Sequence, residues 1–251
     1  MDIPEPLLKD GRLKLSTGVT LECILKAPNP SSDPQTCSQL AICLHPWSWL
    51  GGQMNDPVLR SLDGVLKQAG YHVLRYNSRA VGRSTGRSSF TGFDEAKDLE
   101  AIVEWASENM PQLRDVALIG YSHGSLVASL HPPRKYQSSE SESVNIRHIL
   151  ISYPLGPRSF LTLFRHSFYE KKLEELVQDP QSKVLILYGD RDEFTGVDRY
   201  KEWTARLKAL PGTSEDRLGV VHVEGASHFW NDEESCDRLW ASVFEWVSVS
   251  T

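Results

Sequence analysis

Short apolar runs recur along the chain and alternate with longer segments in which apolar residues return every three or four positions. Residues 40–44 form one continuous apolar run, which is typical of a strand buried on both faces of a sheet. Residues 93–110 instead place Ala96, Leu99 and Ile102 at helical spacing. The pattern predicts strands at 19–25, 40–44, 71–76, 115–119, 146–153, 183–188 and 219–223, and helices at 56–70, 93–110, 125–130, 159–177, 197–210 and 232–247.

Predicted strands and helices follow one another almost to the end of the chain. This order predicts an α/β protein with a mostly parallel, twisted sheet covered by helices on both faces. Residues 11–27 are expected to form two short strands ahead of it. Because no internal repeat or linker interrupts the pattern, we expect residues 1–251 to form a single domain.

The composition excludes several functional classes. The formal net charge is −6 and no basic stripe is visible, so nucleic acid is not an expected partner. No apolar run approaches the roughly 18 residues needed to span a membrane, and residues 1–6 do not resemble a signal peptide. A cytoplasmic protein without a membrane partner is therefore expected. No metal or other cofactor is indicated, because the four cysteines lack metal-like spacing; they are Cys23, Cys37, Cys43 and Cys236.

The first chemical motif is Gly120-Tyr121-Ser122-His123-Gly124, which lies between a predicted strand and a predicted helix. A Gly-x-Ser-x-Gly sequence in this context is typical of a nucleophile elbow, a sharp turn that exposes a serine hydroxyl. The glycines are needed because strand and helix approach closely there. The pattern therefore predicts Ser122 as a nucleophile.

A serine hydroxyl needs a base, and the base needs an orienting acid. In an open parallel sheet such groups gather at the carboxyl ends of the strands. One predicted strand is followed by Asp190, Asp192 and Glu193, and a later one by His228. The chain order serine, acid, histidine is that of α/β-hydrolases, with any of the three carboxylates as the acid.

Several stretches together resemble the α/β-hydrolase superfamily over nearly the whole chain, and most closely its small, lid-poor members similar to dienelactone hydrolase. The resemblance implies an α/β-hydrolase fold with a minimal cap. In such proteins the acid usually stands in a G-x-x-D sequence, which selects Asp192 over its neighbours. The matching stretches are 45–46 with 51–52, 77–79 with 82–84, the elbow, 189–192 and 225–229.

An oxyanion hole in this family takes one N–H from the residue after the nucleophile, which is His123. The second N–H comes from the loop after an early core strand. Pro46 has no N–H, so Trp47 is the first donor after it, with Ser48 as the alternative. We expect His45 to brace this loop through hydrogen bonds.

Aromatic residues flank the expected active centre. Trp49, Phe229 and Trp230, together with Trp47, would either line a pocket for an acyl group or belong to the core. A second aromatic group, Phe160, Phe164 and Phe168, recurs at helical spacing, which is more often typical of a core-facing stripe than of the roof of a pocket. The segment that contains this stripe is too short for a large cap.

These features predict a serine hydrolase that cleaves a small-molecule carboxylic ester or thioester through a Ser122–His228–Asp192 triad and an acyl-enzyme. A stand-alone thioesterase or acyltransferase, which releases or lactonises a polyketide or acyl chain bound to an acyl-carrier domain, would use the same chemistry. A non-catalytic binding module with the hydrolase fold is the alternative from a different class.

Overall fold

The computed structural model describes residues 8, 10–29, 38–133 and 143–249. Residues 1–6 and Cys37, on which the sequence analysis drew, lie outside the described residues, as does most of the proline-rich stretch at 28–38. Within the described ranges no helix is long and apolar enough to cross a lipid bilayer.

All eight described strands belong to one sheet, in the order β1-β2-β4-β3-β5-β6-β7-β8. β2 pairs antiparallel with both β1 and β4, and every pairing from β4 to β8 is parallel. The predicted mostly parallel α/β sheet is therefore confirmed. The strands are β1 (Arg12–Lys14), β2 (Thr20–Lys26), β3 (Gln39–Leu44), β4 (His72–Tyr76), β5 (Asp115–Tyr121), β6 (Asn145–Ile151), β7 (Lys183–Arg191) and β8 (Leu218–Ser227).

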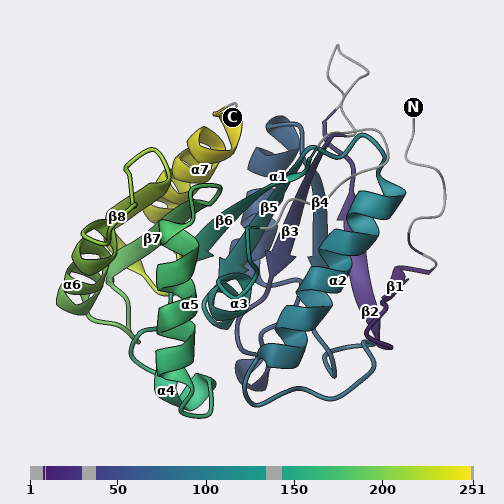
Figure 1. The fold of residues 1–251 in the computed structure, drawn as a ribbon, viewed down its shortest axis with the longest axis horizontal. Helices are drawn as coiled ribbons and strands as arrows, with labels where there is room; N and C mark the ends of the chain where they lie inside the picture. Colours follow the sequence, from purple (N-terminus) through teal and green to yellow (C-terminus); the bar gives the residue numbers. More distant parts are fainter. Residues whose placement is uncertain (1–7, 9, 30–37, 134–142, 250–251) are drawn as a thin grey trace.

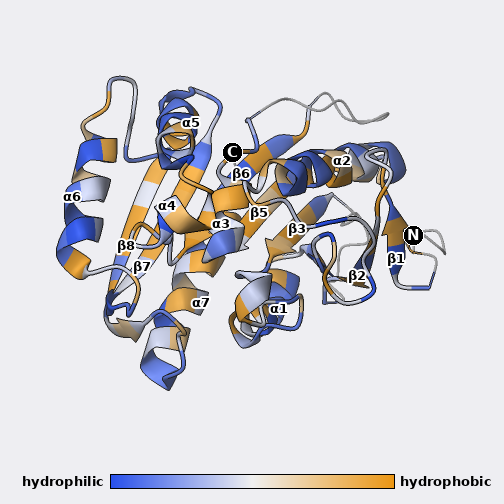
Figure 2. Ribbon diagram, turned by 90° about the horizontal axis from the view of Figure 1, so that it is seen from below, coloured by the Kyte–Doolittle hydropathy of each residue, from blue (hydrophilic) through white to orange (hydrophobic). Residues whose placement is uncertain are grey.

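Helices cover both faces of the sheet, as Figures 1 and 2 show. α1 and α7 pack on one face through residues such as Leu62 and Leu239. α2, α3, α5 and α6 pack on the other through residues such as Leu99 and Leu173. The helices are α1 (Pro57–Gln68), α2 (Phe93–Asn109), α3 (His123–Ala128), α4 (Arg158–Leu161), α5 (His166–Gln178), α6 (Val197–Lys208) and α7 (Glu233–Ser248), with a 3₁₀ turn η1 at Ser48–Leu50.

The prediction of a single helix at 159–177 is wrong, because the structure has two helices there, α4 and α5. Leu163 and Phe164 adopt left-handed backbone conformations, with φ of 47° and 62°, and end the first helix. The chain turns there, so the side chains of Phe160 and Phe164 are 67% and 74% exposed. The prediction that they form a core-facing stripe is therefore also wrong.

Candidate active site

The turn between β5 and α3 holds Ser122 in a strained conformation, with φ of 53° and ψ of −119°. The two glycines of the motif make the turn sterically feasible. A Cβ on Gly120 would lie 2.4 Å from the Gly124 carbonyl oxygen, and a Cβ on Gly124 would lie 2.2 Å from that of Leu44. Helix α3 begins at His123, two residues earlier than predicted, because it follows the turn directly.

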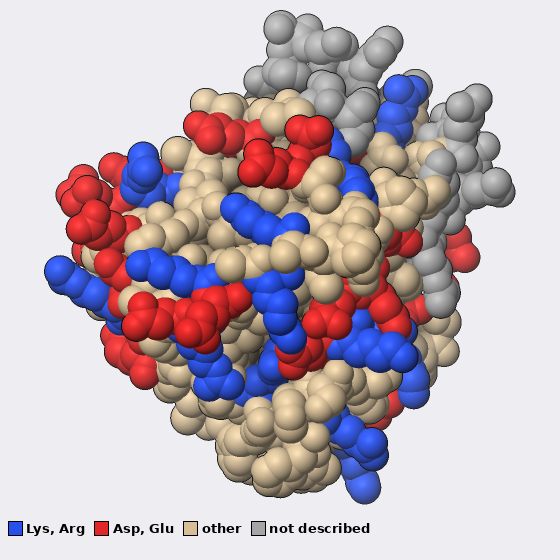
Figure 3. Space-filling model, turned by 60° about the vertical axis from the view of Figure 1, so that its left-hand side comes forward, with Lys and Arg blue, Asp and Glu red and all other residues tan. Residues whose placement is uncertain are grey.

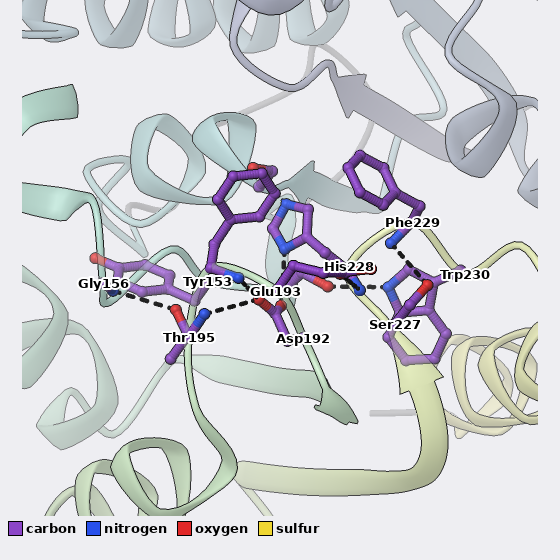
Figure 4. Close-up of polar contacts among 12 residues, drawn as sticks. Tyr153, Gly156, Asp192, Glu193, Thr195, Ser227, His228, Phe229 and Trp230 are labelled. Atoms are coloured by element: carbon purple, nitrogen blue, oxygen red, sulfur yellow. Dashed lines mark hydrogen bonds and ion pairs between the residues drawn. The ribbon is translucent and has the colours of Figure 1, made fainter.

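Three side chains that are distant in the sequence form one chain of hydrogen bonds. The Ser122 hydroxyl lies 3.0 Å from Nε2 of His228, and Nδ1 of His228 lies 2.7 Å from Oδ2 of Asp192. Since a carboxylate accepts, Nδ1 carries the imidazole hydrogen and Nε2 is left to accept from the serine. Figure 4 shows the His228 ring above the Asp192 carboxylate. The structure thus brings together the three residues expected to form a triad.

Asp192 is fixed by the backbone of its own loop. Its Oδ1 accepts hydrogen bonds from the N–H groups of Phe194 (2.8 Å) and Thr195 (2.9 Å). Its Oδ2, which faces His228, also accepts one from the Tyr200 hydroxyl at 3.2 Å. The carboxylate side chain is fully buried. These contacts hold one oxygen toward the imidazole.

The two neighbouring acids meet different groups. Asp190 accepts from the backbone N–H of Gly225 at 2.7 Å, and Glu193 accepts from the backbone N–H of His228 at 2.9 Å. Both therefore contact the loop that carries His228, and neither contact involves its ring. Among the three carboxylates, Asp192 is the one hydrogen-bonded to the imidazole.

His228 is held in position by two aromatic residues for which the sequence predicted no role, Tyr121 and Phe194. The Tyr121 hydroxyl donates to the carbonyl oxygen of His228 at 3.0 Å. The Phe194 ring meets the imidazole edge-on, with 4.6 Å between ring centroids. Each lies within two positions of a predicted triad residue, Ser122 or Asp192. This closeness in sequence is the only feature from which their contact with His228 could have been predicted.

The loop after β3 is braced by His45, as expected. Its Nε2 accepts from the backbone N–H of Ser78 at 3.1 Å, so Nδ1 carries the hydrogen and donates to the carbonyl oxygen of Pro46 at 2.7 Å. Burial lowers the pKa of His45 to about 4, and the Pro46 contact opposes this shift. A neutral His45 keeps both hydrogen bonds at ordinary pH.

Two cavities meet along this loop. The first, which we name the Ser122 chamber, has a volume of about 310 Å³ and is lined by Ser122, His228 and Phe229 among others. The second, the aromatic chamber, measures about 350 Å³ and includes Trp49 and His123 in its lining. The two share three lining residues, Trp47, Phe160 and Leu161.

The predicted oxyanion and pocket residues divide between these chambers. Trp47 lines both chambers, whereas Ser48 and His123 line only the aromatic one of the two. The N–H of His123 opens α3 and has no acceptor within that helix. Trp230 belongs to the core and does not line either chamber: it is 2% exposed, and its Nε1–H donates to the Ser152 hydroxyl at 2.9 Å.

Neither chamber has lysine or arginine among its described lining residues. Each contains one carboxylate instead, Asp56 in the Ser122 chamber and Glu95 in the aromatic chamber. Burial raises the pKa of Asp56, while its hydrogen bonds to the first turn of α1 and the nearby His228 oppose the shift. The site therefore offers apolar walls and a negative local charge.

Comparison with known proteins agrees with this architecture. Residues 26–138 match the family model of X-Pro dipeptidyl-peptidases of the S15 family, a span that includes the elbow and ends before Asp192 and His228. An uncharacterized protein of Rickettsia prowazekii, RP471, is 28% identical over 192 residues, which cover 76% of this chain and 71% of that protein.

Solved structures match over nearly the whole chain. XC6422 of Xanthomonas campestris, described as an α/β serine hydrolase without a lid, aligns with a TM-score of 0.69 at 24% identity and covers 94% of this chain and 91% of its own. The esterase Pf2001 of Pyrococcus furiosus aligns with a TM-score of 0.65 at 21% identity over 94% and 90% of the two chains. The chain therefore has the α/β-hydrolase fold.

Proposed function

We propose that this protein is a serine hydrolase that cleaves carboxylic esters through an acyl-enzyme. The observation that carries the proposal is the unbroken hydrogen-bond chain from Ser122 through His228 to Asp192, at 3.0 and 2.7 Å. It starts at a serine held in a strained elbow and ends at a buried carboxylate. The esterase and serine-hydrolase descriptions of the similar folds support the same chemistry.

The geometry assigns a role to each group. As the Ser122 oxygen bonds to the substrate carbonyl carbon, its proton passes to Nε2 of His228, and Asp192 stabilises the resulting imidazolium. The N–H groups of His123 and Trp47 receive the carbonyl oxygen as it becomes negative. His228 then gives the proton to the leaving oxygen as the ester bond breaks. Water, deprotonated by the same imidazole, releases the acid from Ser122 and restores the serine.

An ester fits the groove better than a peptide. A bound peptide brings an N–H and a carbonyl at each residue, and each needs a partner when buried. The apolar part of the walls, which includes Phe160 and Phe229, offers no such partner. Although part of the chain matches X-Pro peptidases, we therefore expect little cleavage of an X-Pro anilide.

A thioester would react by the same steps, because the acyl-enzyme is common to both reactions. A thioesterase that acts on a carrier-bound acyl chain is therefore the alternative to an esterase, and it would use the same triad. Acylcholine and acylthiocholine substrates with the same acyl group differ only in the ester oxygen or sulfur, so a side-by-side assay distinguishes an ester preference from a thioester preference.

The decisive experiment replaces the nucleophile. Ser122→Ala should keep the fold and lower kcat on a p-nitrophenyl ester by several orders of magnitude, about 10⁶-fold in well-studied triads. A fluorophosphonate probe should label the wild-type protein at Ser122 and leave the variant unlabelled. Labelling without turnover of any acyl substrate would instead favour a hydrolase-fold binding module. Full activity in Ser122→Ala would exclude this mechanism.

A further inference from the structure

We infer that the aromatic chamber is the acyl-binding site and that it selects long, uncharged acyl chains. This inference rests on the proposed function, because it takes Ser122 as the attacking group. It concerns a cavity that lies beside the triad and contains neither Ser122 nor His228 in its lining.

The direction of proton transfer shows on which side of Ser122 each part of a bound ester lies. We call these parts the alcohol arm, which leaves, and the acyl arm, which stays on the serine. The leaving oxygen must receive a proton from Nε2 of His228, so the alcohol arm lies on the His228 side. That side is the Ser122 chamber, whose lining includes His228, Phe194 and Phe229. The acyl arm stays bonded to Ser122 and extends past the other wall. Trp47, which both chambers share, therefore marks the boundary over which the acyl chain passes.

The aromatic chamber suits an apolar chain in size and lining. Its volume of about 350 Å³ lies within the range of small-molecule sites. Trp47 stacks against Trp49 at 6.1 Å between ring centroids, and Phe90 lies 6.0 Å from Trp49, so the rings form a continuous wall. Figure 3 shows a broad uncharged surface at the lower end of the molecule, the end where α4 lies in Figure 1.

The exposure of these rings indicates that a ligand covers them. Trp49, Phe90 and Phe164 are 65%, 68% and 74% exposed, although burying such rings from water is strongly favourable. Phe164 and its neighbour Leu163 also adopt the left-handed backbone conformation that bulky residues avoid. Strain of this kind is concentrated at ligand clamps, where a side chain must be held in one place. Both residues line the aromatic chamber.

The charge of the chamber excludes acidic acyl groups. Its one described carboxylate, Glu95, is 7% exposed and accepts hydrogen bonds from both the N–H and the hydroxyl of Ser89. No lysine or arginine among the described lining residues would balance a second negative charge. A carboxylate at the far end of an acyl chain would have to be buried beside Glu95 without a partner.

The test is a series of p-nitrophenyl esters from acetyl to dodecanoyl, in which the leaving group is constant. In the wild-type protein kcat/KM should rise with each added methylene, by up to about fourfold where the methylene is fully buried. Phe164→Ala and Phe90→Ala should each lower the ratio of decanoyl to acetyl kcat/KM by about tenfold. Phe168→Ala is the matched control, because Phe168 lines neither chamber, and it should keep the wild-type ratio.

A second, independent measurement compares a neutral with a negatively charged acyl group, before and after a positive charge is added to the aromatic chamber. The wild-type protein should prefer the hexanoyl ester to the mono-p-nitrophenyl ester of adipic acid by at least tenfold, and Phe90→Lys should reduce that preference. Phe90 is highly exposed, so this variant should fold even if Phe164→Ala does not.

Two results would overturn the assignment. Ser122-dependent turnover without any dependence on acyl length would refute it and leave the esterase proposal standing. Chain-length selectivity that is lost in Phe229→Ala but kept in Phe90→Ala and Phe164→Ala would place the acyl arm in the Ser122 chamber. No turnover of any ester and no fluorophosphonate labelling would remove both proposals together.

Discussion

Asp190, Asp192 and Glu193 lie within four positions, and each carboxylate has its own partner. Asp190 and Glu193 accept from backbone N–H groups at Gly225 and His228, whereas Asp192 accepts from the His228 ring. The first two contacts set the path of the loop, and the third orients the imidazole. Substitution of each acid should therefore have a different effect.

Asp192→Asn should lower kcat by about 10⁴-fold, because an amide in place of the carboxylate favours the wrong imidazole tautomer. Asp190→Asn is the control, since it removes the same charge two residues away and leaves the imidazole contact intact; its loss of kcat should stay below about tenfold. Steady-state kinetics on one p-nitrophenyl ester compares them. Equal losses in the two variants would assign the acid differently.

Trp49 and Trp230 illustrate how far single residues could be predicted. Both follow a strand end and stand near a predicted catalytic residue, so local sequence gave them the same interpretation. The structure leaves Trp49 65% exposed and buries Trp230, which has the Ser152 hydroxyl as partner. That partner is 78 residues away in the sequence, and a contact of this range leaves no local pattern.

At the scale of elements, the elbow depends on how closely strand and helix approach. A Cβ on Gly124 would lie 2.2 Å from the Leu44 carbonyl oxygen, and backbone cannot move away as a side chain can. Gly124→Ala should destabilise the protein by about 1–3 kcal/mol and distort the Ser122 position. Unfolding in urea measures the first effect, and fluorophosphonate labelling rate measures the second.

Gly64 provides the matched control within a helix. It is exposed on α1, where an added Cβ would meet no atom within 4 Å. Gly64→Ala should stabilise the protein by about 0.5–1 kcal/mol, because alanine loses less backbone entropy in a helix. If Gly64→Ala and Gly124→Ala changed the free energy of unfolding in the same way, close approach of strand and helix would not explain why position 124 needs glycine.

Most elements were predictable because apolar periodicity follows directly from burial in a layered sheet. The strands at 40–44 and 183–188 and the helix at 197–210 were found to within a few residues of β3, β7 and α6. The break between α4 and α5 was not predicted, because residues 158–178 contain no glycine or proline that would mark it. Leu163 and Phe164 adopt left-handed conformations there, which bulky residues rarely do, so local preference gave no sign of the break.

At the scale of the whole molecule, the site was predictable where topology alone brings residues together. Ser122, Asp192 and His228 directly follow β5, β7 and β8, and parallel strands place such positions at one edge of the sheet. The aromatic chamber was not predictable, because Phe90 and Phe164 reach it from loops that no strand order positions.

Buried histidines should make the stability of the whole fold depend on pH. His45 and His148 are 6% and 0% exposed, and burial lowers the pKa of each from 6.5 to about 4 in the folded protein. For His148 the opposing influence is its hydrogen bond to the His131 carbonyl oxygen, at 2.9 Å. Within the described residues, Nδ1 of His148 has no hydrogen-bond partner, so a proton there would create a buried, unpaired charge.

The unfolded chain binds these protons near pH 6.5, whereas the folded protein binds them near pH 4. Between these values the unfolded state carries more protons, so the free energy of unfolding falls as the pH falls through this window. Each histidine contributes a slope of up to about 1.4 kcal/mol per pH unit. His148→Gln removes one titrating group, and urea unfolding from pH 4 to 8 should show a correspondingly shallower slope for this variant. Identical slopes in the two proteins would mean that His148 takes up its proton in the folded state.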